Sequence, residues 1–303
     1  MDRDTLSILI LSYNRLDDLK ENLEYLLKAF PKNQICVVDN NSSDGTVNYL
    51  KTKKAESENL DVILNDTNLG VAEGRNTGRR KLKSKYILHL DDDTHISKNE
   101  VEKLVGYLES NLQIGVVSPR VIHKSTAFQQ NEHGDETKEV GNYHGACHLV
   151  RYEALKVTGD IDPECTFGGE EIDYSIRLRE NGFGVAYLHI AKAIHNNFTR
   201  VGVQNSDRRK KRVYNYCRIH HKHFTFRNAL PFSLRYTTSH IKSAIKNGLI
   251  NAPLIYPWYM LKGVLSGRRQ HEKVKKSVES YYRDKNTRPD FGNVPLVNKL
   301  QSR

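Results

Sequence analysis

Apolar runs alternate with helix-forming stretches over the first 93 residues, and this alternation limits the fold more than any other feature of the chain. Four runs of strand character each end in polar turn residues; they cover 6–11, 34–38, 60–64 and 86–90. In the stretch between the first two runs, leucines recur at spacings of three and four. The order predicts an α/β domain with a mostly parallel sheet, helices on both faces and right-handed crossovers.

Composition narrows the class of protein. The chain has 303 residues and four widely spaced cysteines without CxxC spacing, so neither a zinc site nor a disulfide framework is indicated. No uninterrupted apolar run is long enough to span a membrane, because Asn251, Pro253, Pro257 and Lys262 interrupt the best candidate, 249–265. The cysteine pattern favours a reducing compartment, and the chain opens directly into a strand pattern without a signal peptide, so we expect a cytoplasmic location.

Charge is distributed unevenly along the chain. Residues 198–303 hold 23 Lys and Arg against 5 Asp and Glu, whereas residues 1–197 hold 24 against 31. We therefore expect two parts with different roles: an α/β domain over 1–197, and a basic, mainly helical region over 198–303.

Three consecutive carboxylates end the fourth apolar run. Asp91, Asp92 and Asp93 follow a buried strand at the edge where α/β proteins bind ligands. A cluster of negative charge there is best explained by a divalent metal ion, although an acidic cap before a solvated turn is the simpler alternative.

Other strand ends also carry polar groups. Asp39 precedes several small polar residues, which favours hydrogen bonding to a nucleobase and ribose, whereas one capping residue would suffice structurally. Glycines 70, 74 and 78 place small residues along one side of a helix, for close approach to either a neighbour or a ligand. They match neither GxxxxGK[ST] nor GxGxxG.

A second acidic cluster opens a later helix. Glu170, Glu171 and Asp173 crowd its first turn, which suits the helix dipole but exceeds what a cap needs. Gly168 and Gly169 before them would allow a sharp turn and leave room for a substrate. His195 follows a further strand pattern and, as neutral imidazole, could complete a metal site.

These motifs together resemble family 2 glycosyltransferases of the GT-A fold, a Rossmann-like architecture. The resemblance covers about residues 5–198. It rests on five segments in register: Ser12-Tyr13-Asn14, Val38 to Thr46, Asn68-Leu69-Gly70 with Asn76 and Gly78, Leu90 to Asp93, and Gly169 to Asp173.

The resemblance implies inverting transfer of a sugar from a nucleoside diphosphate sugar to a hydroxyl acceptor, assisted by Mn²⁺ or Mg²⁺. It divides 1–197 into a nucleotide-binding half, about 1–95, and an acceptor half, about 96–197. Asp93 and His195 would bind the metal, Glu171 would be the general base and Glu170 would help hold the acceptor. The implied donor-binding residues are Ser12, Tyr13, Asn14, Asp39, Asn68, Gly70, Asn76, Asp91 and Asp92, of which Asp92 would be mainly a spacer.

One position departs from the family pattern. Glu171 stands where the family usually has Asp, which lengthens the side chain by one methylene group. A glutamate remains competent as a base, and Glu170 or Asp173 could take that role instead.

The basic region leaves several partners open. Basic and aromatic residues between 232 and 265 predict amphipathic helices that meet an anionic membrane, and so a peripheral location on its inner face. The region could instead bind an anionic glycan acceptor or form an oligomer. Two rival functions remain. A sugar-phosphate nucleotidylyltransferase would need an N-terminal glycine-rich loop that is missing, and a nucleic-acid-binding protein would need a recognised motif.

Overall fold

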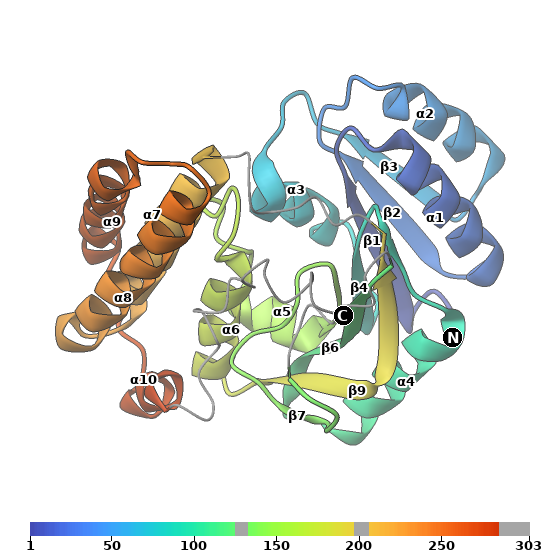
Figure 1. The fold of residues 1–303 in the computed structure, drawn as a ribbon. Coiled ribbons are helices and arrows are strands. Elements are labelled where there is room, and N and C mark those ends of the chain that lie inside the picture. Colours follow the sequence, from blue (N-terminus) through green and yellow to red (C-terminus); the bar gives the residue numbers. More distant parts are fainter. Residues whose placement is uncertain (125–132, 197–205, 285–303) are drawn as a thin grey trace.

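The computed structural model describes residues 1–124, 133–196 and 206–284. Its centre is one sheet with strand order β3-β2-β1-β4-β8-β6-β9-β5, and β7 pairs with β9. The strands are β1 (Leu6–Ser12), β2 (Gln34–Asp39), β3 (Leu60–Leu64), β4 (Tyr86–Asp91), β5 (Thr94–His95), β6 (Ile114–His123), β7 (Lys138–Glu139), β8 (Cys147–Arg151) and β9 (Gly184–His195). Helices lie on both sides of this sheet (Figure 1).

Alternating side chains of the central strands separate the two faces. On β1, Ile8 and Ile10 join the core beneath α1 (Leu16–Ala29), α2 (Thr46–Glu56) and α4 (Lys98–Ser110). Leu9 points the other way, into a smaller cluster. That second face carries α3 (Gly70–Arg79), α5 (Tyr152–Thr158) and α6 (Glu170–Glu180). The expected α/β sheet with helices on both faces is confirmed.

Helix α3 explains the evenly spaced glycines. A methyl group on Gly78 would overlap Leu9 Cδ1 and lie 2.9 Å from Val38 Cγ2, and one on Gly74 would lie 2.8 Å from Leu11 Cδ1. Gly74 and Gly78 therefore allow the helix to pack closely against β1 and β2. Of the two alternatives, close approach to a neighbouring element is the one observed for these two glycines.

Strand direction differs from the simplest expectation at β8. This strand runs antiparallel to both of its neighbours, β4 and β6, whereas β1, β2, β3 and β4 pair in parallel. The two short strand patterns over 184–194 form one strand, β9, with an irregularity between Leu188 and Lys192. Side-chain periodicity does not encode strand direction, so neither feature could be read from it.

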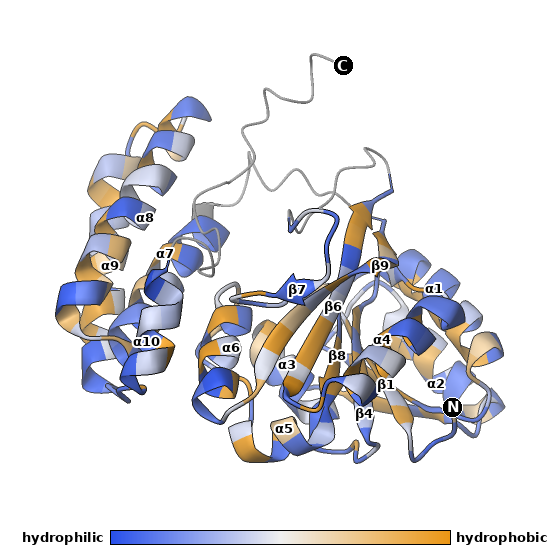
Figure 2. Ribbon diagram, turned by 90° about the horizontal axis from the view of Figure 1, so that it is seen from below, coloured by the Kyte–Doolittle hydropathy of each residue, from blue (hydrophilic) through white to orange (hydrophobic). Residues whose placement is uncertain are grey.

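The described part of the basic region, 206–284, is mainly helical, as expected. It contains α7 (Ser206–His223), α8 (Phe226–Lys246), α9 (Ala252–Arg269) and α10 (Lys276–Arg283). Figure 2 shows these helices as a layer beside the α/β part. Helices α7 and α10 also share a buried cluster with α6, which includes Ile176, Ile219 and Val278. Within the described ranges, no helix is both long and apolar enough to cross a lipid bilayer.

Candidate active site

Strand pairing gathers the predicted site residues at one edge of the sheet. Parallel pairing sets Ser12 opposite Asp39 and Leu11 opposite Asp91, so the carboxyl ends of β1, β2 and β4 coincide. The short antiparallel pair β5–β9 sets Thr94 opposite His195. The end of β9 is thereby brought to the acidic end of β4, although about one hundred residues separate them in sequence.

Asp91, Asp93 and His195 form the cluster best suited to a metal ion. One ligand atom from each lies within 4.8 Å of the others. His195 Nε2 lies 2.9 Å from Asp93 Oδ1, and the Asp93 side chain is fully buried. Among the described residues, this is the one group of three or more His, Cys, Asp or Glu with such spacing. The neighbouring histidines His220, His221 and His223 of α7 do not form a second such group.

The donor set fits Mg²⁺ or Mn²⁺. Two carboxylates and an imidazole are the hard and borderline ligands that these ions accept. Burial lowers the pKa of His195, which favours the neutral, ligating form. The Arg15 guanidinium contacts Asp93 Oδ2 and is about one third exposed. The Asp93 carboxylate thus lies between the Arg15 guanidinium and the His195 ring.

Asp92 is turned toward β1. Its carboxylate accepts a hydrogen bond of 2.9 Å from the Ser12 hydroxyl and one of 3.3 Å from the Tyr13 amide. Burial raises the pKa of Asp92 to about 7, although Arg15 opposes this shift. The side chain therefore fixes the start of the loop after β1, and its role as a spacer stays a prediction.

Asp39 keeps one acceptor free. Its Oδ2 accepts the Ser42 amide at 2.9 Å, while its buried Oδ1 has no hydrogen-bond partner among the described residues. An unpartnered buried acceptor is costly unless a ligand supplies a donor. A nucleobase that donates a hydrogen bond to Oδ1 would satisfy this acceptor, and the contact stays a prediction.

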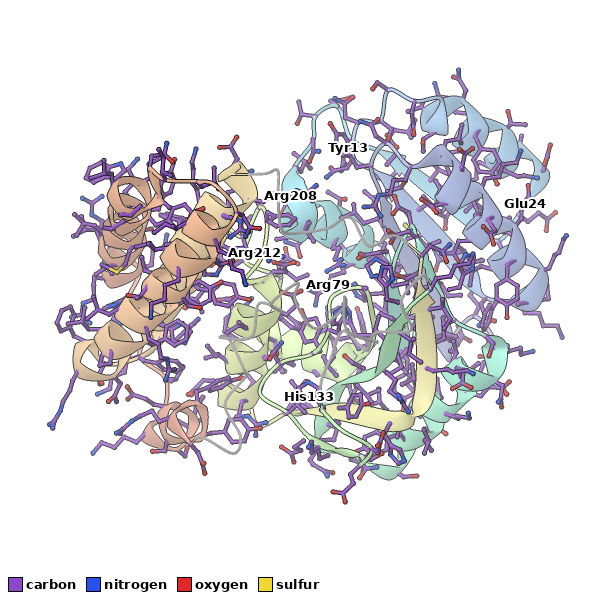
Figure 3. The ribbon with its side chains drawn as sticks, in the orientation of Figure 1. Tyr13, Glu24, Arg79, His133, Arg208 and Arg212 are labelled. Atoms are coloured by element: carbon purple, nitrogen blue, oxygen red, sulfur yellow. The ribbon has the colours of Figure 1, made fainter. Side chains whose placement is uncertain are left out.

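Asn14 ties two loops together at the same edge. Its backbone is left-handed, with φ of 53°, and its Oδ1 accepts the Ser43 amide at 2.7 Å. The backbone N–H of Asn14 donates to the Ser42 hydroxyl. The neighbouring Tyr13 is nearly half exposed and lies on the loop after β1 (Figure 3). Of the two, Tyr13 has the side chain free to meet a ligand.

The Asn68 segment is held by an asparagine that the sequence did not single out for a role. Asn40 Nδ2 donates to Asn68 Oδ1 at 3.0 Å and to the Gly70 carbonyl at 3.1 Å. Asn76 is fully buried, and its amide exchanges hydrogen bonds of 2.7 and 2.9 Å with the backbone of Ile161. Asn40, Asn68 and Asn76 thus shape the loops around the site, and a donor contact by Asn68, Gly70 or Asn76 stays a prediction.

The two adjacent glutamates approach the same edge from α6. A methyl group on Gly145 would lie 2.5 Å from Glu171 Oε1, so the missing side chain at Gly145 admits this carboxylate beside β8. Glu170 is buried, and within the described parts of the chain its Oε2 has no hydrogen-bond partner. Burial raises the pKa of both carboxyls, and the charge of Glu171 raises that of Glu170 further.

Arg75 links the glutamates to the acidic end of β4. Its Nη2 donates to Asp91 Oδ1 at 2.7 Å and to the Gly145 carbonyl at 2.9 Å. Its Nη1 is buried and finds no hydrogen-bond partner in the part of the chain that the structure describes. Its positive charge lowers the pKa of Glu170 and of Glu171, against the effect of burial. One fully buried guanidinium therefore serves both sides of the site.

Asp173, the third acidic residue of α6, is engaged elsewhere. It is fully buried and pairs with Arg177 Nε at 2.8 Å and His223 Nε2 at 2.8 Å, with Lys222 Nζ at 3.5 Å. Burial would raise the pKa of Asp173, but these partners hold it well below its usual range. The alternative of Asp173 as general base is therefore disfavoured, because a carboxylate fixed in this way accepts no further proton near neutral pH.

The space beside Gly168 and Gly169 corrects an expectation. Both residues have left-handed φ angles, of 75° and 98°, so the sharp turn is confirmed. Methyl groups there would lie 2.9 Å from Arg212 Cγ and 2.8 Å from Ile219 Cδ1. Helix α7, and not a substrate, fills the room that the glycines leave.

Three arginines of the site were not predicted from the sequence. Arg15 directly follows the Ser12-Tyr13-Asn14 segment and Arg75 directly precedes Asn76, but nothing in their spacing indicated a role. Arg212 stacks on the Phe167 ring at 5.2 Å, and its charge lowers the pKa of Glu170 and Glu171. Figure 3 shows Arg208 and Arg212 on α7 next to the α/β part. In the sequence, Arg208 and Arg212 belong to a run of basic residues. Such a run is usually a solvated helix face, so the pattern did not identify them as part of the site.

Two sequence families match the chain. The profile of "Glycosyl transferase family 2" matches residues 7–161, and that of "Glycosyl transferase family group 2" matches residues 86–267. An uncharacterized glycosyltransferase of Haemophilus influenzae is 34% identical over 113 residues, which are 37% of each chain. A putative teichuronic acid biosynthesis glycosyltransferase of Bacillus subtilis is 27% identical over 103 residues, 34% of this chain and 41% of the relative. The aligned part thus spans well under half of these relatives.

Solved structures share the fold at low sequence identity. The chain resembles GalNAc-T7, solved with UDP, GalNAc and Mn²⁺, with a TM-score of 0.63 and 15% identity over 88% of this chain and 58% of that one. It resembles TarS of S. aureus with a TM-score of 0.56 and 18% identity over 92% and 55%. The chain belongs to glycosyl transferase family 2 and has the GT-A fold.

Proposed function

We propose that this protein is an inverting glycosyltransferase that moves a sugar from a nucleoside diphosphate sugar to a hydroxyl of a glycan or lipid-linked acceptor. The observation that carries the proposal is the convergence of Asp91, Asp93 and His195 with Glu171 at one sheet edge, joined through Arg75. Two structural neighbours were solved with a nucleotide or nucleotide sugar and Mn²⁺, which supports the same donor class here.

The acidic cluster would hold the metal. We assign Asp93 and His195 as ligands, with Asp91 beside them, and a bound Mg²⁺ or Mn²⁺ would neutralise charge on the diphosphate leaving group. Asp39, with its unpartnered Oδ1, would accept a hydrogen bond from the nucleobase. Tyr13 lies on the adjacent loop and would cover that base.

Glu171 would accept the proton of the attacking hydroxyl. Single displacement inverts the anomeric centre when base and leaving group lie on opposite sides of the sugar. Glu171 reaches the edge through the gap at Gly145. Burial raises the pKa of its carboxyl, and the charge of Arg75 opposes that rise. Glu170, buried with a free Oε2, would hold the acceptor.

The curated relatives suggest in which kind of pathway the protein acts. The similar proteins include the teichuronic acid biosynthesis enzyme and a poly-β-1,6-N-acetyl-D-glucosamine synthase of Staphylococcus epidermidis, 27% identical over 124 residues. We infer a role in cell-surface polysaccharide or glycoconjugate synthesis. We place it in the cytoplasm beside the inner face of the membrane, with 1–197 as the catalytic domain and 198–303 as the basic region.

A donor screen tests the proposal. Purified protein is incubated with UDP-, GDP- or dTDP-sugars and Mn²⁺, and release of the nucleoside diphosphate is measured with and without simple glycoside acceptors. One donor should give release that depends on both protein and metal, and the Glu171→Gln variant should lose it. Absence of turnover with every donor, together with absence of nucleotide binding, would contradict the assignment.

A further inference from the structure

Helix α9 is apolar on two opposite faces, although one of them is exposed. The inner face carries Ala252, Tyr256, Gly263 and Gly267, all buried. Methyl groups on the two glycines would overlap backbone carbonyl oxygens of α7, so the two helix backbones are in close contact. This face accounts for the attachment of α9 to the protein.

The outer face has no partner in the structure described here. It carries Leu254, Trp258, Leu261 and Leu265 at spacings of four, three and four, and Ile250 precedes the helix. Their exposed fractions are 82%, 54%, 44% and 51%, and Ile250 is 85% exposed. We call these five residues the outer stripe. A surface helix normally places polar residues on its solvent face, so such a stripe marks an interaction surface.

Basic residues surround the outer stripe. Residues 208–271 contain 14 Lys and Arg and no Asp or Glu. Those on and beside α9 are exposed: Lys242, Lys246, Lys262, Arg268 and Arg269. Lys262 Nζ lies 5.0 Å from the centre of the Trp258 ring. In Figure 2, α9 lies at the outside of the helical layer, away from the sheet.

We propose that the outer stripe docks on an anionic lipid surface, with α9 lying along the interface. Leucine and tryptophan side chains would enter the boundary between headgroups and acyl chains, while the lysine and arginine heads would meet lipid phosphates. A second copy of the chain fits less well, because it would bring two uniformly basic surfaces together without an intervening carboxylate. An anionic bilayer supplies both the apolar layer and the counter-charge.

Trp258 makes the proposal directly testable, because it is the chain's single tryptophan. Its fluorescence is measured in the full-length protein, without nucleotide, upon addition of phosphatidylcholine vesicles or equimolar phosphatidylcholine–phosphatidylglycerol vesicles. We expect a blue shift and co-flotation with the anionic vesicles alone, weakened in high salt. The triple variant Leu254→Ser, Leu261→Ser, Leu265→Ser should reduce partitioning more than tenfold.

The matched control is Leu112→Ser, which removes a leucine that is 71% exposed in the connection between α4 and β6. It should bind vesicles like the wild type. Two results would overturn the proposal: no response to anionic vesicles, or a stripe-dependent dimer in sedimentation that binds no vesicles. Neither result depends on transfer of a sugar, so failure here is distinguishable from failure of the proposed function.

Discussion

At the residue scale, the site combines carboxylates whose environments differ sharply. Asp173 lies between three basic side chains, whereas burial and the charge of Glu171 raise the pKa of Glu170 and the charge of Arg75 lowers it. Residue type alone gave no means of ranking them, and the assignment of Glu171 as base rested on the family resemblance. The structure leaves Glu171 as the carboxylate that reaches the sheet edge.

Glu171→Gln should abolish turnover and spare nucleotide binding. The amide cannot accept the hydroxyl proton, and loss of a general base costs about 10²–10⁴-fold in rate. Turnover is measured as nucleotide release, and binding by calorimetry. Glu153→Gln, an exposed glutamate on α5, is the control and should be active. If Glu170→Gln were the inactive variant and Glu171→Gln active, the two roles would be exchanged.

Arg75→Met should move the pH–rate profile toward alkaline values. A nearby cation favours the ionised carboxylate, so without Arg75 the pKa of Glu171 rises and the base is protonated up to a higher pH. The rise of kcat/KM with pH should move by about one pH unit or more.

The control for that experiment is Arg80→Met, at the C-cap of the same helix. Arg80 is half exposed and pairs with Glu73 and Asp160, away from the glutamates. Its profile should match that of the wild type. An unmoved profile in Arg75→Met, with activity retained, would remove Arg75 from the control of the base.

At the element scale, local patterns predicted most of the architecture. The leucine spacing predicted helix α1, and the polar loop before Thr46 predicted the start of α2. Gly182, with φ of 84°, follows the end of α6 as expected. Strand direction and long-range pairing were not available from those patterns, because they depend on contacts such as β5 with β9. The proximity of His195 to Asp93 followed only from the family resemblance and not from local sequence.

Gly78→Ala should destabilise the protein by about 1–3 kcal/mol, since overpacking strains a filled core. The added methyl group would overlap Leu9 and crowd Val38. Gly106→Ala on α4 is the matched control, because a methyl group there meets nothing within 4 Å. It should stabilise by about 0.4–1 kcal/mol. Urea denaturation checks both, and equal stability of the two variants would contradict the packing of α3.

At the scale of the whole molecule, buried ion pairs connect the helical layer to the α/β part. Arg218, fully buried on α7, pairs with Asp162 at 2.8 Å, and Lys222 pairs with the same carboxylate at 2.9 Å. His223 reaches Asp173 on α6. The excess of basic residues beyond 197 therefore includes charges used internally, which a count by sequence could not separate from surface charge.

Asp173→Asn should cost about 3–5 kcal/mol of stability at pH 7, because it leaves buried cations without their counter-charge. The folded-state pKa of Asp173 is depressed, so its contribution is present above the unfolded pKa of about 3.9 and declines as pH falls below that value. The difference between variant and wild type should shrink accordingly in urea denaturation at pH 7 and below pH 4.

Asp160→Asn provides the control, since Asp160 forms an exposed pair with Arg80. It should change stability by less than about 1 kcal/mol at pH 7. A loss for Asp173→Asn no larger than that of the control would mean that the buried network does not hold α7 against α6.

The most direct test of the central claim is calorimetric titration of nucleoside diphosphates into wild-type protein and Asp93→Ala, each with and without Mn²⁺. If Asp93 and its neighbours hold the ion that receives the diphosphate, wild-type protein binds one nucleotide in a metal-dependent manner. Asp93→Ala should lose the metal dependence while its circular dichroism spectrum remains native. Metal-dependent binding that is unchanged in Asp93→Ala would show that this sheet edge is not the site of the reaction.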